Sequence, residues 1–244
     1  MITSVRSLLA ATVLAGSAFA AAPAMAQDIG VEVSANAAVV SEYRFRGVDL
    51  SGGDIAIQGG IDLGLPAGFY VGTWGSSIDE DTVGYGHTEL DVYGGWAGEF
   101  GSLSTDVGVI AYLYPNAGAG DFDYIEAYAS VGAAVGPAEV TFGVAYAPEQ
   151  DSLGGGDNLY LYTDLGVGIP GTPVSVSGHL GYTDGDYLTF TNDGEAFDWS
   201  IGADVALGDT LSIGGAYVGA EGDYLPGEYE LTDDGFVVTL SASF

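Results

Sequence analysis

Histidine is the side chain best suited to general-base chemistry near neutral pH, and this sequence contains two, His87 and His179. Both are expected on the polar face of a predicted strand. Neither adjoins a Ser or Asp in a motif that marks an activated nucleophile, as a barrel lipase or an omptin-type protease would require. The sequence has no Cys, which excludes thiolate nucleophiles, Cys-ligated metals and disulfides. We therefore expect a protein that is not an enzyme and that needs no cofactor.

Carboxylates are the second group of side chains that could do chemistry, because Asp and Glu total 34 whereas Lys and Arg total 3. Hard cations such as Ca²⁺ and Mg²⁺ bind several carboxylate oxygens, and acidic clusters fall in predicted loops. The weak candidates for such a site are Asp79, Glu80, Asp81, Asp184, Asp186, Asp233 and Asp234. No 12-residue EF-hand spacing is present, so a solvated anionic surface is the alternative interpretation.

The same imbalance of charge limits the possible partners. Nucleic-acid binding requires Lys and Arg to displace counterions from phosphate, and this chain has almost none. Hydrophobic residues make up 48% of the sequence and aromatic residues 12%, which is far above the content of a disordered acidic tail. The composition therefore indicates a folded, apolar and anionic chain.

The N-terminal residues have the order of a secretory signal peptide. Arg6 precedes an apolar stretch over residues 8–20, and the small-residue tail Ala24-Met25-Ala26 follows. The apolar stretch of about 13 residues is short for a membrane span of roughly 20 residues. We expect residues 1–26 to be a cleaved signal peptide and residues 27–244 to form one exported domain.

Alternation of polar and apolar residues dominates that domain. Between residues 87 and 100, for example, Leu90 and Val92 share one face of a strand, and Glu89, Asp91 and Tyr93 share the other. Twelve strands are expected, near residues 31–46, 54–65, 68–76, 87–99, 102–114, 122–135, 138–147, 157–168, 173–183, 196–207, 210–220 and 235–244. The facing of the third is ambiguous, because either Phe69 and Val71 or Tyr70 and Trp74 could form its apolar side.

The connections between these strands alternate between tight turns and longer polar links. Outer-membrane barrels have this arrangement, with an even number of strands, short periplasmic turns and long external loops. We therefore expect an all-β fold, a transmembrane antiparallel up-and-down β-barrel of about 12 strands in the bacterial outer membrane. A soluble exported β-sandwich would also alternate, but it would not need the strict succession of short and long connections.

The polarity of the two faces predicts which one lines the lumen. Unpaired carboxylates cannot be buried in a dry core without a cost of several kcal/mol, so the polar face is expected to meet water and the apolar face outer-membrane lipid. The predicted lumen-lining residues are Arg44, Arg46, Asp62, Glu89, Asp91, Asp106, Glu126, Asp164, His179, Asp198 and Asp204. The last strand ends on Phe244, a terminal aromatic that resembles the signal read by the barrel assembly machinery.

Arg44 and Arg46 are the only basic side chains after the signal peptide. Two residues apart on the first predicted strand, they share a face, while Tyr43 and Phe45 are expected on the lipid side in an interfacial aromatic belt. We expect both arginines to pair across the lumen with acids such as Asp62 or Glu89. There they would serve as a strut between carboxylates or as an anchor for an anionic group of a solute.

Residues 40–78 resemble the TorF-type porin family of proteobacteria. The pattern places Ser41, Tyr43, Phe45, Arg46 and Gly47 in a first block, Ala56, Gln58 and Gly59 in a second, and Gly68, Tyr70, Gly72, Trp74 and Ser76 in a third. The resemblance implies a Gram-negative outer-membrane barrel that acts as a porin, and it supplies no substrate and no catalytic residue.

The expected function is passive diffusion of small solutes through a narrow, acidic lumen that prefers cations. The alternative is a non-conducting barrel, either structural or an adhesin, with acidic loops that could bind divalent cations. Twelve strands and many lumen tyrosines leave little free space, whereas the many lumen glycines would leave more. The permeant solute, gating and oligomeric state stay open.

Overall fold

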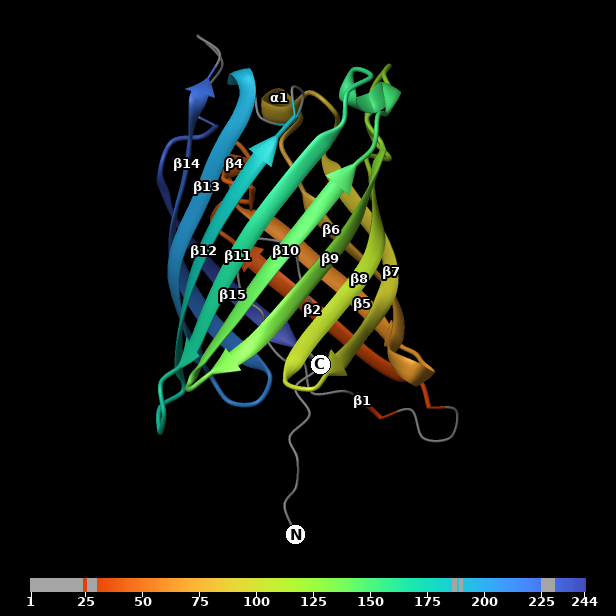
Figure 1. Cartoon of the computed structure of the whole chain (residues 1–244). Coiled ribbons are helices and arrows are strands. Elements are labelled where there is room, and N and C mark those ends of the chain that lie inside the picture. Colours follow the sequence, from red (N-terminus) through yellow and green to blue (C-terminus); the bar gives the residue numbers. More distant parts are fainter. Residues whose placement is uncertain (1–23, 26–29, 186–187, 189–190, 225–230) are drawn as a thin grey trace.

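The computed structural model describes residues 24–25, 30–185, 188, 191–224 and 231–244. Twelve antiparallel strands form a barrel in which each strand pairs with its neighbours along the chain (Figure 1). The last strand, β15 (Gly235–Ser243), pairs with the first, β2 (Glu32–Val40), and so closes the sheet. The predicted fold class is confirmed.

The barrel strands between these two follow one another in simple order. They are β5 (Ala56–Gly64), β6 (Phe69–Ser77), β7 (Thr88–Phe100), β8 (Leu103–Leu113), β9 (Tyr124–Val135), β10 (Ala138–Ala147), β11 (Asn158–Gly168), β12 (Val174–Asp184), β13 (Thr191–Ala206) and β14 (Leu211–Tyr224). The short β1 (Ala24–Met25) adds to the edge of β2. Among the described residues, three helical turns lie in connections: η1 (Pro66–Gly68), α1 (Glu80–Val83) and η2 (Asp151–Leu153).

Long connections lie at one end of the barrel and short turns at the other, where the C-terminus also lies (Figure 1). The strands β13 and β14 extend beyond their predicted bounds at the long-loop end, where Thr191 still pairs with Tyr224 across a bulge. Of the helices that the structure describes, none has the length and apolar character required to cross a membrane. The predicted signal peptide, apart from β1, lies outside the described residues.

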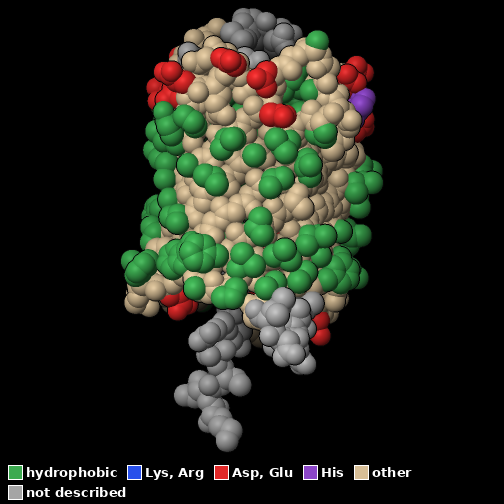
Figure 2. All heavy atoms as spheres, turned by 90° about the vertical axis from the view of Figure 1, so that its right-hand side faces the viewer, with side chains coloured by type: hydrophobic (Ala, Val, Ile, Leu, Met, Phe, Trp, Pro, Cys, Tyr) green, Lys and Arg blue, Asp and Glu red, His purple; other side chains and the backbone are tan. Residues whose placement is uncertain are grey.

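The outer surface of the barrel carries the apolar side chains. Ile57, Val109 and Ile201, for example, are 54–68% exposed on three different strands. On β6 the outward residues are Phe69 and Val71, which resolves the facing that the sequence left ambiguous. Figure 2 shows apolar side chains over the wall and acidic side chains near its two ends. Phe244 is exposed, and its backbone continues the ladder by hydrogen bonds with Ala35.

Tyrosine rings cover the inner wall by lying over glycines of neighbouring strands. Directly paired positions across strands are Tyr93 with Gly72, Tyr70 with Gly95, Tyr128 with Gly108, and Tyr162 with Gly143. A β-carbon placed at Gly143 would lie 2.1 Å from the ring of Tyr162. The expectation that lumen glycines leave more free space is therefore wrong at these four positions, because a ring of the next strand fills the space above each of them.

The first strand is the one element that differs in kind from its prediction. The expected strand over residues 31–46 ends at Val40, and residues 41–55 turn into the barrel as a separate structure. We call residues 41–55 the interior hairpin. Their inward course changes the position of both arginines and of their aromatic neighbours.

Candidate functional site

The interior hairpin consists of β3 (Arg44–Phe45) and β4 (Val48–Asp49), joined by Arg46 and Gly47. Both turn residues have positive φ, 49° and 80° respectively. Positive φ at both central positions defines the type I′ turn, which suits a two-residue hairpin and normally uses Gly, Asn or Asp. The Arg-Gly pair of the sequence motif is therefore the tip of a tight hairpin.

The hairpin crosses the barrel interior in its long-loop half. Tyr43, Val48 and Leu50 are buried, and the backbone of the tip lies against β13 and β14. A β-carbon placed at Gly47 would lie 2.7 Å from Cβ of Ala220 on β14 and 2.9 Å from Cβ of Asp198 on β13. Glycine is thus required at the tip both by its backbone conformation and by the close approach to the wall.

Arg46 makes the central polar contact of the hairpin. Its Nη2 donates a hydrogen bond of 2.7 Å to Oε2 of Glu126 on β9, and the two side chains are 4% and 0% exposed. The guanidinium carbon also lies 4.2 Å from the ring centroid of Tyr160 on β11. A carboxylate and an aromatic ring are the two favourable partners of a guanidinium group.

Arg44 contacts its own hairpin and a neighbouring loop instead of the barrel wall. It forms an ion pair with Glu42, and its Nη1 donates to the carbonyl oxygens of Gly47 and Leu231 at 3.1 and 3.0 Å. Arg46 thus pairs with an acid across the interior, as predicted, but the partner is Glu126 and not Asp62 or Glu89, because the chain reverses at the turn and carries Arg46 to β9. For Arg44 the predicted pairing across the lumen is wrong.

Tyr43 and Phe45 were expected on the lipid side, and this prediction is also wrong. The hydroxyl of Tyr43 donates a hydrogen bond of 2.6 Å to Oε1 of Glu89, and its ring lies 5.6 Å from that of Trp74. Phe45 packs edge-on against Tyr112 at 5.6 Å. Burial raises the pKa of Tyr43 well above its usual value, so its hydroxyl stays a donor.

Backbone hydrogen bonds fasten the hairpin to two loops. The amide of Asp49 donates to the carbonyl of Leu231 at 2.8 Å, and the amide of Asp79 donates to the carbonyl of Leu50 at 2.9 Å. The carboxylate of Asp49 accepts the amides of Ser51 and Gly53 at 2.8 and 2.6 Å. The hairpin therefore has a defined place between the loops at this end of the barrel.

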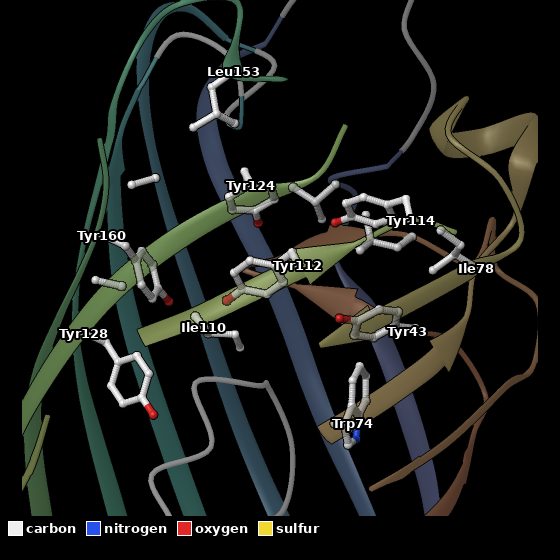
Figure 3. Packing of buried hydrophobic residues seen from close by; sticks show 14 of the residues in the cluster. Tyr43, Trp74, Ile78, Ile110, Tyr112, Tyr114, Tyr124, Tyr128, Leu153 and Tyr160 are labelled. Atoms are coloured by element: carbon white, nitrogen blue, oxygen red, sulfur yellow. The ribbon is translucent and has the colours of Figure 1, made fainter. Parts of the chain in front are cut away.

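Carboxylates of the wall surround the hairpin. The acids nearest to it are Glu89, Asp91, Glu126 and Asp198, which are each at most 4% exposed. Within the described residues, neither oxygen of Asp91 and only one oxygen of Glu126 has a hydrogen-bond partner. Figure 3 shows the aromatic residues of this region, with Tyr112 and Tyr124 stacked at 4.5 Å and Tyr43 and Trp74 below Tyr114.

The remaining predicted lumen residues lie on the inner face nearer the short-turn end. Tyr93 donates to Asp62 and Tyr70 donates to Asp106, each at 2.6 Å. Asp204 lies on the same face of β13 as Asp198.

His179 lies between two carboxylates on this inner face. Its Nδ1 is 2.6 Å from Oδ1 of Asp164, and its Nε2 is 3.0 Å from Oδ1 of Asp198. The Tyr160 hydroxyl lies 2.8 Å from the same Nε2. Tyr160 therefore contacts His179 through its hydroxyl and Arg46 through its ring. His87, expected inside, is instead 67% exposed and pairs with Glu80, because β7 begins one residue later.

The acidic loops do not assemble a metal site in the part of the chain that the structure describes, where no group of three or more His, Cys, Asp or Glu has suitable geometry. Asp79 accepts a hydrogen bond from the hydroxyl of Thr82, and Asp234 accepts one from Tyr217. Asp186 lies outside the described residues. Glu80, Asp81 and Asp233, and Asp184 at the end of β12, therefore stay candidates without an assembled site.

The sequence did not identify Tyr43, Phe45 and Tyr160 as parts of the site. The signal for the hairpin was present in the dipeptide Arg46-Gly47, which is flanked by two alternating pairs as in a two-residue turn. Nothing in the local sequence indicated Tyr160 as the partner of Arg46.

Comparison with known proteins gives a family and a fold. A family model described as "Bacterial protein of unknown function (Gcw_chp)" matches residues 24–244. No curated protein matches the sequence. The barrel is similar to the NanC porin, with a TM-score of 0.59 and 10% identity over 87% of this chain and 98% of that chain.

Two further solved structures have a similar barrel. The KdgM porin has a TM-score of 0.57 and 7% identity over 86% of this chain and 98% of its own. An outer membrane channel from Pseudomonas putida F1 has a TM-score of 0.50 and 12% identity over 89% and 96%. At these identities the similarity concerns the fold alone.

Proposed function

The chain belongs to the Gcw_chp family of bacterial proteins of unknown function, and we propose that it is an outer-membrane porin for passive diffusion of small solutes, cations in preference to anions. The observation that carries the proposal is the division of the wall into an apolar outer face and a carboxylate-rich inner face. Lipid can solvate the first, and the second requires water or cations.

The outer face supports a place in the bacterial outer membrane. A closed barrel leaves no unpaired strand edge, which is the condition for β-structure in lipid. The named similarity to porins and an outer membrane channel agrees with this location. The cleaved signal over residues 1–26 and recognition of Phe244 by the barrel assembly machinery belong to the same proposal.

The inner face supports the preference for cations. Interior carboxylates on β5, β7, β8, β9 and β13 include Asp62, Glu89, Asp106, Glu126 and Asp198. Of the two described arginines, Arg44 is engaged by Glu42 and Arg46 meets Glu126 at the wall, while His179 lies beside Asp198. Fixed negative charges in a narrow passage attract cations and repel anions.

The interior hairpin is the constriction of this proposed channel. It contacts β6, β7, β8, β9 and β11 through side chains and approaches β13 and β14 at its tip. Because the hairpin fills part of the barrel interior, it also favours the second candidate function, a non-conducting structural or adhesin-type barrel. The TorF-type resemblance of residues 40–78 implies a porin and so supports the first function. The block of that resemblance that ends in Gly47 forms the first strand and the turn of the hairpin.

The test is solute flux into vesicles. Purified protein, refolded into liposomes, should admit small neutral and cationic solutes faster than anionic solutes of equal size. Liposomes that contain a barrel denatured before reconstitution serve as the control. Equal leak rates in both preparations for every solute would favour the non-conducting barrel.

A further inference from the structure

The wall residues around Arg46 have the features of a binding site for an organic cation. Glu126 supplies a fully buried carboxylate, and the ring of Tyr160 covers the guanidinium at 4.2 Å. Tyr112 donates a hydrogen bond of 3.3 Å to the same carboxylate oxygen that Arg46 uses. These three residues belong to β8, β9 and β11, whereas Arg46 comes from a loop segment that enters from β2. The pocket and its occupant are therefore separate parts of the chain.

Hydrogen-bond acceptors remain in and next to the pocket after Arg46 is bound. Oε1 of Glu126 and both oxygens of Asp91 have no hydrogen-bond partner among the described residues, and both side chains are 0% exposed. Arg46 thus occupies one oxygen of Glu126 and leaves the other able to accept a hydrogen bond from a second or a replacement cation.

The chemistry of the pocket favours an organic cation over a metal ion. The described residues contain no metal-binding cluster of three or more His, Cys, Asp or Glu. An aromatic face next to a carboxylate suits a weakly hydrated, flat or alkylated cation, whereas Ca²⁺ and Mg²⁺ require several oxygens.

We propose that Glu126, Tyr160 and Tyr112 form a binding site for small solutes that carry a guanidinium or primary ammonium group, and that Arg46 is its tethered occupant. The role of this site in permeation rests on the proposed porin function, but binding itself does not. A solute that enters the pocket displaces Arg46 and loosens the interior hairpin. Solutes of this class therefore open the constriction by binding, and solutes without such a group do not.

The first test measures binding to the refolded barrel in detergent. Methylguanidinium is the probe, and methylurea is its neutral analogue of nearly the same shape. In Arg46→Gln the pocket is vacated, so methylguanidinium should raise the thermal unfolding midpoint saturably, at concentrations at least about tenfold lower than in the wild type. Methylurea should have no such effect, and Arg46→Gln combined with Glu126→Gln should remove the response.

A second measurement uses the wild-type protein and so does not depend on the folding of a variant. Methylguanidinium should accelerate hydrogen exchange at the amides of Asp49 and Leu50, which the seated hairpin protects, whereas methylurea should not. Equal effects of the two probes would overturn the site. Solute flux in vesicles is measured without these probes, so loss of the site and loss of the porin function are distinguishable.

Discussion

Replacing Gly47 with Ala should displace the interior hairpin while leaving the barrel intact. The new methyl group would lie 2.7 Å from Cβ of Ala220, whereas carbon atoms normally approach to about 3.5–4.0 Å. The tip must therefore retreat by roughly 1 Å, which lengthens the 2.7 Å bond between Arg46 and Glu126 beyond hydrogen-bond range.

The magnitude follows from two terms. An L-residue in the left-handed conformation costs roughly 1–2 kcal/mol, and loss of a hydrogen bond to a charged group costs roughly 1.5–3 kcal/mol. A total of about 3 kcal/mol corresponds to an increase of about 100-fold in the population of the displaced hairpin, since 1.4 kcal/mol is tenfold.

The assay is hydrogen exchange at Leu50, whose amide donates to Tyr43 within the hairpin at 2.8 Å. Gly101→Ala is the matched control, because Gly101 has a φ of 68° but its added carbon would meet no atom within 4 Å. Protection of Leu50 should fall by about 100-fold in Gly47→Ala and stay unchanged in Gly101→Ala. Equal exchange in both variants would refute the close approach of the tip to β14.

Three further outcomes are expected. Tyr43→Phe keeps the ring but removes the 2.6 Å bond to Glu89, so the seated hairpin should lose about 1.5–3 kcal/mol, measured by exchange of the same amide. Gly143→Ala should lower the thermal midpoint because its carbon would lie 2.1 Å from Tyr162, whereas Gly166→Ala, which meets nothing within 4 Å, should not; equal shifts would contradict the packing of ring over glycine. Cation preference should decrease between 0.1 M and 1 M KCl, because the Debye length falls to about 3 Å, and a preference independent of salt would argue against fixed interior carboxylates.

The strands were predictable because a barrel wall imposes a period of two. Lipid contacts one face and polar groups the other, so residues such as Leu90 and Asp91 alternate visibly in the sequence. Tight turns after long strands likewise have local signals. The alternation also predicts which residues of β7, β8 and β13 face inward. The structure places the predicted Glu89, Asp106 and Asp198 on the inner face.

The interior hairpin was not predictable from the same signal, since its own strands also alternate. Residues 43–46 continue the pattern of β2, and the period does not distinguish a strand in the wall from one inside the barrel. Only the turn at Gly47 marked the reversal. The pairing of Arg46 with Glu126 joins residues 80 positions apart and depends on barrel closure, so no local pattern contains it.

The reversal potential of single channels tests the central claim most directly. The refolded wild-type protein should conduct in planar bilayers, and a tenfold KCl gradient should give a reversal potential of the sign expected for K⁺ selectivity. Gly47→Ala should conduct more than the wild type with the same sign of selectivity. Anion selectivity, or bilayers that stay silent with both proteins, would contradict an acidic channel constricted by the interior hairpin.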